Sequence, residues 1–134
     1  MTIRRLLFIF ALIASTGSVA AQDDLVAAGE KVFVKCKTCH RVGPPTKFVK
    51  STPHLNGLLG RRPGSLPNIK YSEALVAFGH DKVWDEATLT TFLHDPQGVV
   101  KGTKMAFFGL TKDEEIKALL AYLATFDRDG MTSK

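Results

Sequence analysis

The fold of this 134-residue chain is decided by the stretch Cys36-Lys37-Thr38-Cys39-His40. C-x-x-C-H is the pattern of covalent c-type haem attachment, because two thiols at this spacing can each add to one vinyl group of a single porphyrin. The histidine that follows is then held close to the iron and can ligate it. The stretch therefore predicts one haem c, joined by thioethers to Cys36 and Cys39, with His40 as an iron ligand.

Three other uses of these residues remain open. A thioredoxin-like disulfide is one, but the alternation of strands and helices typical of that fold is missing. A zinc site needs four ligands, and the sequence has no second cluster of cysteine and histidine at a suitable spacing. A purely structural disulfide would leave His40 unexplained. Haem attachment is the interpretation that uses all three residues.

The residues that follow are unusually rich in structure breakers. Between positions 41 and 70 the chain holds Gly43, Pro44, Pro45, Pro53, Gly57, Gly60, Pro63, Gly64 and Pro67. This density predicts turns and loops rather than regular structure. Loops of this length are uncommon in a small domain. We therefore expect a metal, a disulfide or a large cofactor to fill the centre.

Apolar spacing of three and four residues predicts helices elsewhere, at about residues 23–36, 71–78, 85–94 and 111–126. Asp23 and Asp24 are the expected caps of the first helix, and Thr111 with Glu114 forms a capping box for the last. Asp95-Pro96 is expected to stop the third helix, and residues 99–109 to form a loop. No alternating strand pattern is present, so the predicted class is all-α.

A second iron ligand should come from the part of the chain after residue 50. The candidates are His54, His80, His94, Met105 and the lysines. Met131 lies in a polar tail that we expect to fray. Met105 lies between two predicted helices in a loop flanked by glycines, which could present one side chain to a haem face. Taken with the attachment motif, this placement favours Met105.

The first twenty residues have the pattern of a secretory signal peptide. Arg4 and Arg5 precede an apolar run at residues 6–14, and small residues follow up to Ala20 and Ala21. We expect cleavage after Ala20 or Ala21, which leaves a single domain at residues 21–134 in the periplasm. An uncleaved membrane anchor is the alternative, although the run is shorter than the roughly 20 residues that span a bilayer.

Positive charge is concentrated in one part of the chain. The net charge is +5, and removal of residues 1–20 leaves 16 basic and 13 acidic side chains, a net charge of +3. Nine basic residues and no acidic residue lie between Lys31 and Lys70, whereas four acids lie between Asp81 and Asp95. This pattern predicts a basic face that steers the protein to acidic redox partners. Its candidate residues are Lys35, Lys37, Arg41, Lys47, Lys50, Lys101 and Lys104.

Residues 21–134 resemble a class I cytochrome c of the small bacterial cytochrome c2 type, which is similar to mitochondrial cytochrome c. The matching segments are Gly29-Glu-Lys-Val-Phe33, Leu55-Asn-Gly-Leu-Leu-Gly-Arg61, Tyr71-Ser-Glu-Ala74 with Trp84, Gly102-Thr-Lys-Met-Ala-Phe107 and Ala121-Tyr-Leu123. The resemblance implies the cytochrome c fold. In that fold the N- and C-terminal helices cross, and short helices and loops surround one covalent haem.

The resemblance also implies a role for individual residues. Met105 would be the second axial ligand. The carbonyl of Pro53 would accept the other ring N–H of His40, which raises the basicity of that ligand. Arg61, Tyr71 and Trp84 would bind the haem propionates.

Several positions depart from the family's usual pattern. Thr52 replaces a glycine before Pro53, and His54 follows that proline. Lys101 replaces a proline, which we expect to loosen the methionine loop. Two further departures are Phe92, where a tyrosine is common, and Leu75, where an asparagine is common. These changes predict an altered potential and an altered internal water network.

With both axial positions filled, the resemblance implies a one-electron carrier and not an enzyme. The implied partners are a quinol-oxidising cytochrome bc complex, a terminal oxidase, a photosynthetic reaction centre or a periplasmic dehydrogenase. We expect a monomer that binds no nucleic acid and does not insert stably into a membrane. Two alternatives remain, a haem enzyme or gas sensor from which Met105 dissociates, and a subunit docked permanently to a dehydrogenase.

Overall fold

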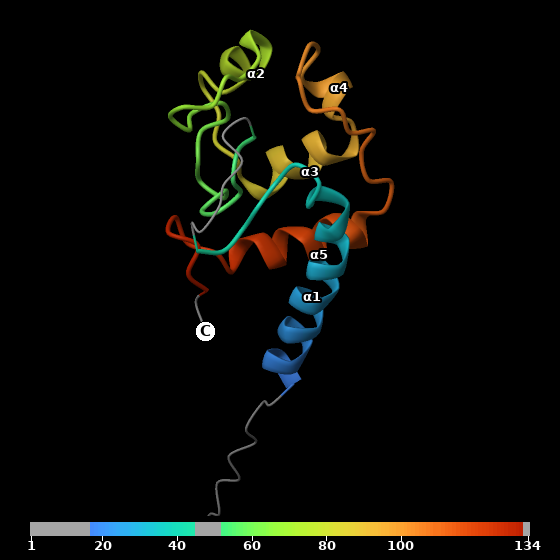
Figure 1. Ribbon diagram of the computed structural model, residues 1–134. Coiled ribbons are helices and arrows are strands. Elements are labelled where there is room, and N and C mark those ends of the chain that lie inside the picture. Colours follow the sequence, from blue (N-terminus) through green and yellow to red (C-terminus); the bar gives the residue numbers. More distant parts are fainter. Residues whose placement is uncertain (1–16, 45–51, 133–134) are drawn as a thin grey trace, which may run out of the picture.

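The computed structural model describes residues 17–44 and 52–132. Its helices are α1 (Gly17–Phe33), the 3₁₀ turn η1 (Val34–Cys36), α2 (Glu73–Phe78), α3 (Glu86–His94), α4 (Pro96–Val99) and α5 (Asp113–Ala124) (Figure 1). Over these ranges no strand is formed, and one isolated bridge joins Phe126 to Thr132. The prediction of an all-α fold is therefore confirmed.

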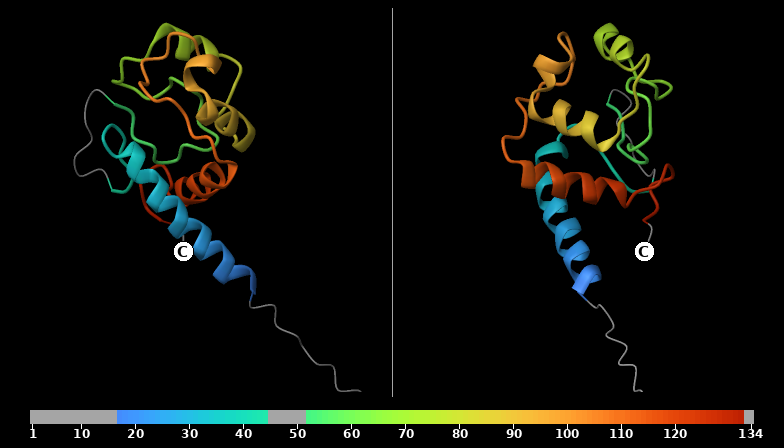
Figure 2. Two further views of the ribbon diagram at one scale, coloured as in Figure 1. Left: turned by 90° about the vertical axis from the view of Figure 1, so that its right-hand side faces the viewer. Right: turned by 180° about the vertical axis from the view of Figure 1, so that it is seen from behind.

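Helices α1 and α5 cross in close backbone contact, as Figures 1 and 2 show. The contact occurs at Gly29, where an added Cβ would overlap the carbonyl of Ala118 and lie 2.7 Å from Cβ of Tyr122. The rings of Phe33 and Tyr122 pack beside this point, with centroids 5.5 Å apart. Glycine is needed here because of this close approach, so the predicted crossing of the terminal helices is present.

One buried apolar cluster lies between the crossed helices and α3. Its members are Phe33, Leu58, Trp84, Leu89, Phe92, Leu93, Val100, Leu110, Ile116, Leu119, Leu120 and Leu123. Ile116, Leu119, Leu120 and Leu123 lie in α5, in the segment whose apolar spacing predicted the final helix. Helix α5 therefore buries one apolar face along its length, and this burial of apolar surface stabilises the fold. The α2 and α4 helices lie beyond α3, at the end of the molecule away from the first turns of α1 (Figure 1).

Two of the predicted helices begin at the caps that their sequences indicate. Ser72 caps α2, and its hydroxyl accepts a hydrogen bond from the Leu75 N–H at 3.2 Å. Asp85 caps α3, and its carboxylate accepts one from the Thr88 N–H at 2.7 Å. Each cap satisfies an N–H that the helix itself leaves unpaired.

The predicted starts of the first and last helices were wrong. Helix α1 begins at Gly17, so Asp23 and Asp24 lie inside it and cap nothing. The physical reason is the alanine-rich stretch before them, which continues the helix towards the N-terminus. Helix α5 has Lys112 at its N-cap and no side-chain cap, so the Thr111–Glu114 box does not form. Acidic residues in the first turn of α5 instead complement the helix dipole.

Two further expectations are corrected after residue 94. Asp95-Pro96 ends α3 but also begins α4, because Asp95 accepts a hydrogen bond from the Gly98 N–H at 2.9 Å and proline suits the first helical position. The C-terminal tail does not fray around Met131. Its amide donates to Asp127 at 2.9 Å, and the Phe126 carbonyl accepts from the Gly57 N–H at 3.1 Å. These contacts tie residues 125–132 to the body of the protein.

Some predictions fall outside the described residues. These are the signal-peptide residues 1–16 and the two basic residues Lys47 and Lys50. No helix in residues 17–44 or 52–132 is long and apolar enough to cross a membrane.

Replacement of Gly29 by alanine tests the helix crossing. The new methyl group would force α1 and α5 apart, so we expect the free energy of unfolding to fall by about 1–3 kcal/mol despite alanine's higher helix propensity. Denaturant titration of the haem-loaded protein measures this change. Ala28→Ser, at an exposed position of the same helix, is the control and should cost much less. Equal stability of Gly29→Ala and the unmodified protein would contradict the close crossing.

Candidate haem site

The C-x-x-C-H stretch forms a compact turn at the end of α1 and η1. The N–H groups of Cys39 and His40 both donate to the Cys36 carbonyl, at 3.1 and 2.8 Å. Cys36 is half-buried and Cys39 is exposed, and neither is joined in a disulfide. Burial raises the pKa of Cys36, and the nearby charge of Lys35 opposes this rise. The turn thus presents two thiols and one imidazole within five residues.

His40 is held by a backbone carbonyl, as the resemblance implied. Its Nδ1 lies 2.8 Å from the Pro53 carbonyl oxygen, which can only accept, so Nδ1 carries the proton. Burial lowers the pKa of His40, the bond to Pro53 raises it, and the charges of Arg61 and Arg41 lower it. The net effect is a pKa below the usual value, so the ring is neutral at pH 7 and its Nε2 lone pair is available to a metal.

A clasp between two loop segments keeps Pro53 in this position. The Leu55 N–H donates to the Arg41 carbonyl at 2.9 Å. The amide of Asn56, which is 2% exposed, accepts from the Gly43 N–H at 2.9 Å and donates to the Gly43 carbonyl at 2.8 Å. No role for Asn56 was predicted from the sequence. The sequence signal that could have indicated this role is an asparagine within the apolar run of residues 55–59.

The three residues expected at the propionates lie together. The backbones of Arg61 and Trp84 are paired, with Trp84 N–H to Arg61 carbonyl at 2.8 Å. The charge of Arg61 acts on Tyr71: burial raises the pKa of the Tyr71 hydroxyl, and Arg61 lowers it. Arg61 also donates to the carbonyls of Asn56 and His54, at 2.9 and 3.0 Å. The guanidinium is therefore fixed to the segment that follows Pro53.

The Trp84 ring belongs to a buried aromatic row. Its centroid lies 5.8 Å from that of Phe78 and 4.9 Å from that of Phe92, with both pairs tilted. Phe92 is 5% exposed, so a tyrosine hydroxyl at this position would lie in the interior. At the position of another departure, the Thr52 hydroxyl is buried without a hydrogen-bond partner in the described part of the chain, and nothing in the structure explains its presence.

Met105 is half-buried in the loop between α4 and α5. Its N–H donates to the Thr103 hydroxyl at 3.3 Å, and its carbonyl accepts from the Gln97 side chain at 2.7 Å. One residue earlier, the Lys104 ammonium donates to the Lys70 carbonyl at 3.2 Å. The loop is thus fixed to neighbouring segments, although it lacks the proline replaced by Lys101.

His94, His80 and Met131 are less well placed than Met105. His94 has both ring nitrogens engaged, with the Leu110 carbonyl at 2.8 Å and the Asp113 carboxylate at 2.7 Å. His80 is exposed, and Met131 is 58% exposed in the tail. In the described ranges, no three side chains of His, Cys, Asp and Glu converge to hold a metal ion. This observation counts against the zinc alternative.

Whether a haem fits here depends on the apolar side chains around these residues. Several of these side chains are partly buried: they pack against the core but keep some accessible surface. They come from α1, η1, the loops, α2, α4, the Met105 loop and α5: Val32, Cys36, Val42, Leu55, Ala74, Leu75, Phe78, Val99, Met105, Phe107 and Tyr122. A large flat apolar group would cover this surface, and Arg61 supplies a cation for its acidic arms. The residues present therefore fit a haem.

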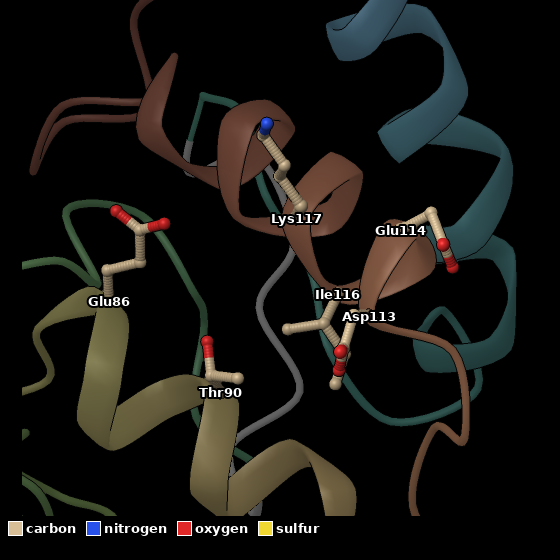
Figure 3. Close-up of a pocket in the computed structure, with 6 residues that line it drawn as sticks. All are labelled: Glu86, Thr90, Asp113, Glu114, Ile116 and Lys117. Atoms are coloured by element: carbon tan, nitrogen blue, oxygen red, sulfur yellow. The ribbon is translucent and has the colours of Figure 1, made fainter.

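A surface hollow elsewhere has a different character. It lies between α3 and α5 and is lined by Glu86, Thr90, Asp113, Glu114, Ile116 and Lys117 (Figure 3). Its lining contains no predicted haem-site residue. Three of its residues are carboxylates and one is a lysine, so this side of the protein is acidic.

Known proteins match the chain over most of its length. The model of the family described as Cytochrome c matches residues 26–127. Cytochrome c2 of Afifella marina is 48% identical over 109 residues, which are 81% of this chain and 87% of that protein. Cytochrome c2 of Blastochloris viridis is 40% identical over 128 residues, which are 95% and 97%. The solved structure of cytochrome cH from Methylobacterium extorquens has a TM-score of 0.67 at 38% identity, covering 75% of this chain and 97% of that one.

Crossed terminal helices, a C-x-x-C-H turn and an apolar surface that suits a porphyrin define a haem c protein. The cytochromes c2 that match it are electron-transfer proteins and not enzymes. The chain belongs to the cytochrome c family. Within that family it is of class I, and the relatives named above include bacterial cytochromes c2. Members of the family carry haem c attached covalently, and the two cysteines of this chain have the required spacing.

The Asn56 clasp is testable by substitution with leucine, which has the same branched shape but no hydrogen-bonding groups. The buried N–H and carbonyl of Gly43 would lose their partners, so we expect the free energy of unfolding to fall by about 2–4 kcal/mol. Denaturant titration measures the change. The control is Asn68→Gly, since Asn68 is exposed and has a φ of 64° that glycine adopts readily. Similar stabilities for both variants would show that the clasp contributes little.

Proposed function

We propose that this protein is a periplasmic one-electron carrier whose covalent haem c has His40 and Met105 as its axial ligands. The observation that supports this most strongly is the position of the His40 ring, held at Nδ1 by the Pro53 carbonyl 2.8 Å away, directly after the two cysteines. A bound haem supplies a single electron site that cycles between ferric and ferrous iron. The chain's part is to hold that site in fixed, largely dry surroundings.

Each group of residues has a separate task in this proposal. Cys36 and Cys39 carry the thioether bonds, while His40 and Met105 occupy the two axial positions. Arg61, Tyr71 and Trp84 bind the propionates, and the backbone pairing of Arg61 with Trp84 and the action of the Arg61 charge on Tyr71 support that role. Because no axial position stays open, oxygen and peroxide have no place to bind. This is why a carrier is favoured over a haem enzyme or gas sensor.

Export is the second element of the proposal. Residues 1–20 would act as a signal peptide, and the mature domain would be residues 21–134 in the periplasm. Cleavage after Ala20 or Ala21 would shorten α1 by its first few residues. Asp23 and Asp24 would then lie in the first turn of the mature helix, where their charges complement its dipole. The name cytochrome c2 of the bacterial relatives supports the same assignment.

The docking surface is the third element. Lys35 is paired with Glu115, with its ammonium 2.8 Å from a carboxylate oxygen, and this bond lowers the pKa of Glu115. Lys37, Arg41 and Lys101 are exposed and carry no ion pair in the described residues. These basic residues and the acidic α3–α5 hollow give the molecule an uneven charge distribution, which would orient it as it approaches a charged partner.

The partners that suit a basic surface are redox proteins with acidic docking faces. We propose a quinol-oxidising cytochrome bc complex, a terminal oxidase, a photosynthetic reaction centre or a periplasmic dehydrogenase. The protein would meet them as a monomer, with no stable membrane insertion and no nucleic acid bound.

Axial ligation is tested by Met105→Leu. Methionine sulfur on ferric iron gives a weak far-red absorption band, so we expect this band in the unmodified protein and its loss in the variant. The ferrous variant should also bind carbon monoxide, because one axial position is open. Met131→Leu, which changes the exposed tail methionine, should behave like the unmodified protein. Carbon monoxide binding to the unmodified ferrous protein without denaturant would favour the sensor or enzyme alternative.

Electrostatic steering is tested by the rate of reduction by membranes that contain the quinol-oxidising complex. The rate should fall steeply between about 10 and 200 mM salt, because the Debye length shrinks from about 30 Å to below 8 Å. Lys37→Gln should lower the low-salt rate more than Lys117→Gln, which makes the same charge change at the acidic hollow. A flat salt profile would contradict steering, and a complex with a dehydrogenase that survives high salt would favour the docked subunit.

A further inference from the structure

The backbone of the Met105 loop has little support of its own. Residues 101–112 form no helix, and the loop turns at Gly102 and Gly109, whose φ angles of 91° and 101° few other residues adopt. Lys101 leaves its own φ free where a proline would fix it. Whatever holds the methionine in place must therefore come from outside the loop or from its side chains.

Helix α4 provides that support at one atom. The Gln97 side-chain N–H donates to the carbonyl of Met105 at 2.7 Å, and the Phe107 N–H donates to the same carbonyl at 3.0 Å. The first bond joins the methionine to a separate helix, whereas the second lies within the loop. Gln97 is thus the side chain that fixes the backbone of Met105 itself to another element.

The position of Gln97 is itself well determined. Asp95 caps α4 by accepting from the Gly98 N–H, and the buried Pro96 sets the first helical residue. The N–H groups of Val99 and Val100 then close the turn, donating at 3.0 Å to the carbonyls of Asp95 and Pro96. Gln97 lies within this closed turn, so the backbone that carries its side chain is fixed in position. The side-chain amide is uncharged, so its hydrogen bond to the Met105 carbonyl does not depend on pH.

We propose that Gln97 is a positioning residue that keeps Met105 on the haem iron by anchoring the Met105 carbonyl to α4. This inference rests on the proposed ligation by Met105. Loss of the anchor makes release of the methionine easier, so an added ligand competes with it more successfully. The fixed turn of α4 and the bond from Gln97 together take over the stiffening that Lys101 does not provide.

The test measures azide binding to the ferric, haem-loaded protein. Removal of one hydrogen bond of ordinary strength should raise azide affinity about 3- to 10-fold in Gln97→Leu. Gln97→Glu keeps the shape of the side chain but replaces the donating N–H by a carboxylate oxygen, which cannot donate to the Met105 carbonyl. This variant should therefore raise the azide affinity at least as much. Gln97→Arg keeps an N–H donor and should restore most of the original affinity. The control is Thr91→Val, which removes a side-chain bond to the Ala87 carbonyl within α3 and should leave azide binding unchanged.

The outcomes separate this inference from the ligation on which it rests. A far-red band in the unmodified protein, with azide affinity unchanged in Gln97→Leu and Gln97→Glu, would overturn the role of Gln97 alone. That role is also overturned if Thr91→Val raises azide affinity as much as Gln97→Leu. Absence of the band in the unmodified protein would overturn Met105 ligation, and the role of Gln97 with it.

Discussion

Backbone contact between α1 and α5 at Gly29 fixes the direction in which the chain leaves α1 towards the cysteines and His40. The later segments are joined to this frame by hydrogen bonds as well as by core packing. Residues 41–43 pair with residues 55–56, and residues 60–61 pair with Trp84. Apolar side chains of some of these segments, Val42 and Leu55 among them, still keep accessible surface. The covalent haem of the family would cover this surface and so complete the core.

The two sides of the proposed haem site are held in different ways. On the His40 side the supporting groups are buried or half-buried, with Asn56 2% exposed and Arg61 fixed to two backbone carbonyls. On the Met105 side they are the exposed side chains of Gln97 and Lys104 and the buried hydroxyl of Thr103. Exposed hydrogen bonds compete with water and contribute less than buried ones. Of the two proposed ligands, Met105 is therefore the one whose position we expect to respond more to substitution.

Local signals in the sequence predicted what is local in the structure. Apolar spacing predicted α2 and α3 at residues 71–78 and 85–94, and the C-x-x-C-H stretch indicated the cofactor. What could not be predicted depends on partners distant in the sequence. The tail is ordered because Phe126 meets Gly57, which no local pattern indicates. Likewise, Asp95 and Pro96 are equally suited to the end of one helix and the start of the next.

Amide hydrogen exchange tests most directly whether the covalent haem completes the fold. The haem-loaded protein is compared with the variant in which Cys36 and Cys39 are both serine. We expect strong protection of the α5 amides around Leu119 and Leu120 in the loaded protein and its loss in the variant, because α5 would lose part of its supporting core. Equal protection of these amides in both proteins would contradict this role of the haem, since the chain would then hold its helix crossing without the cofactor.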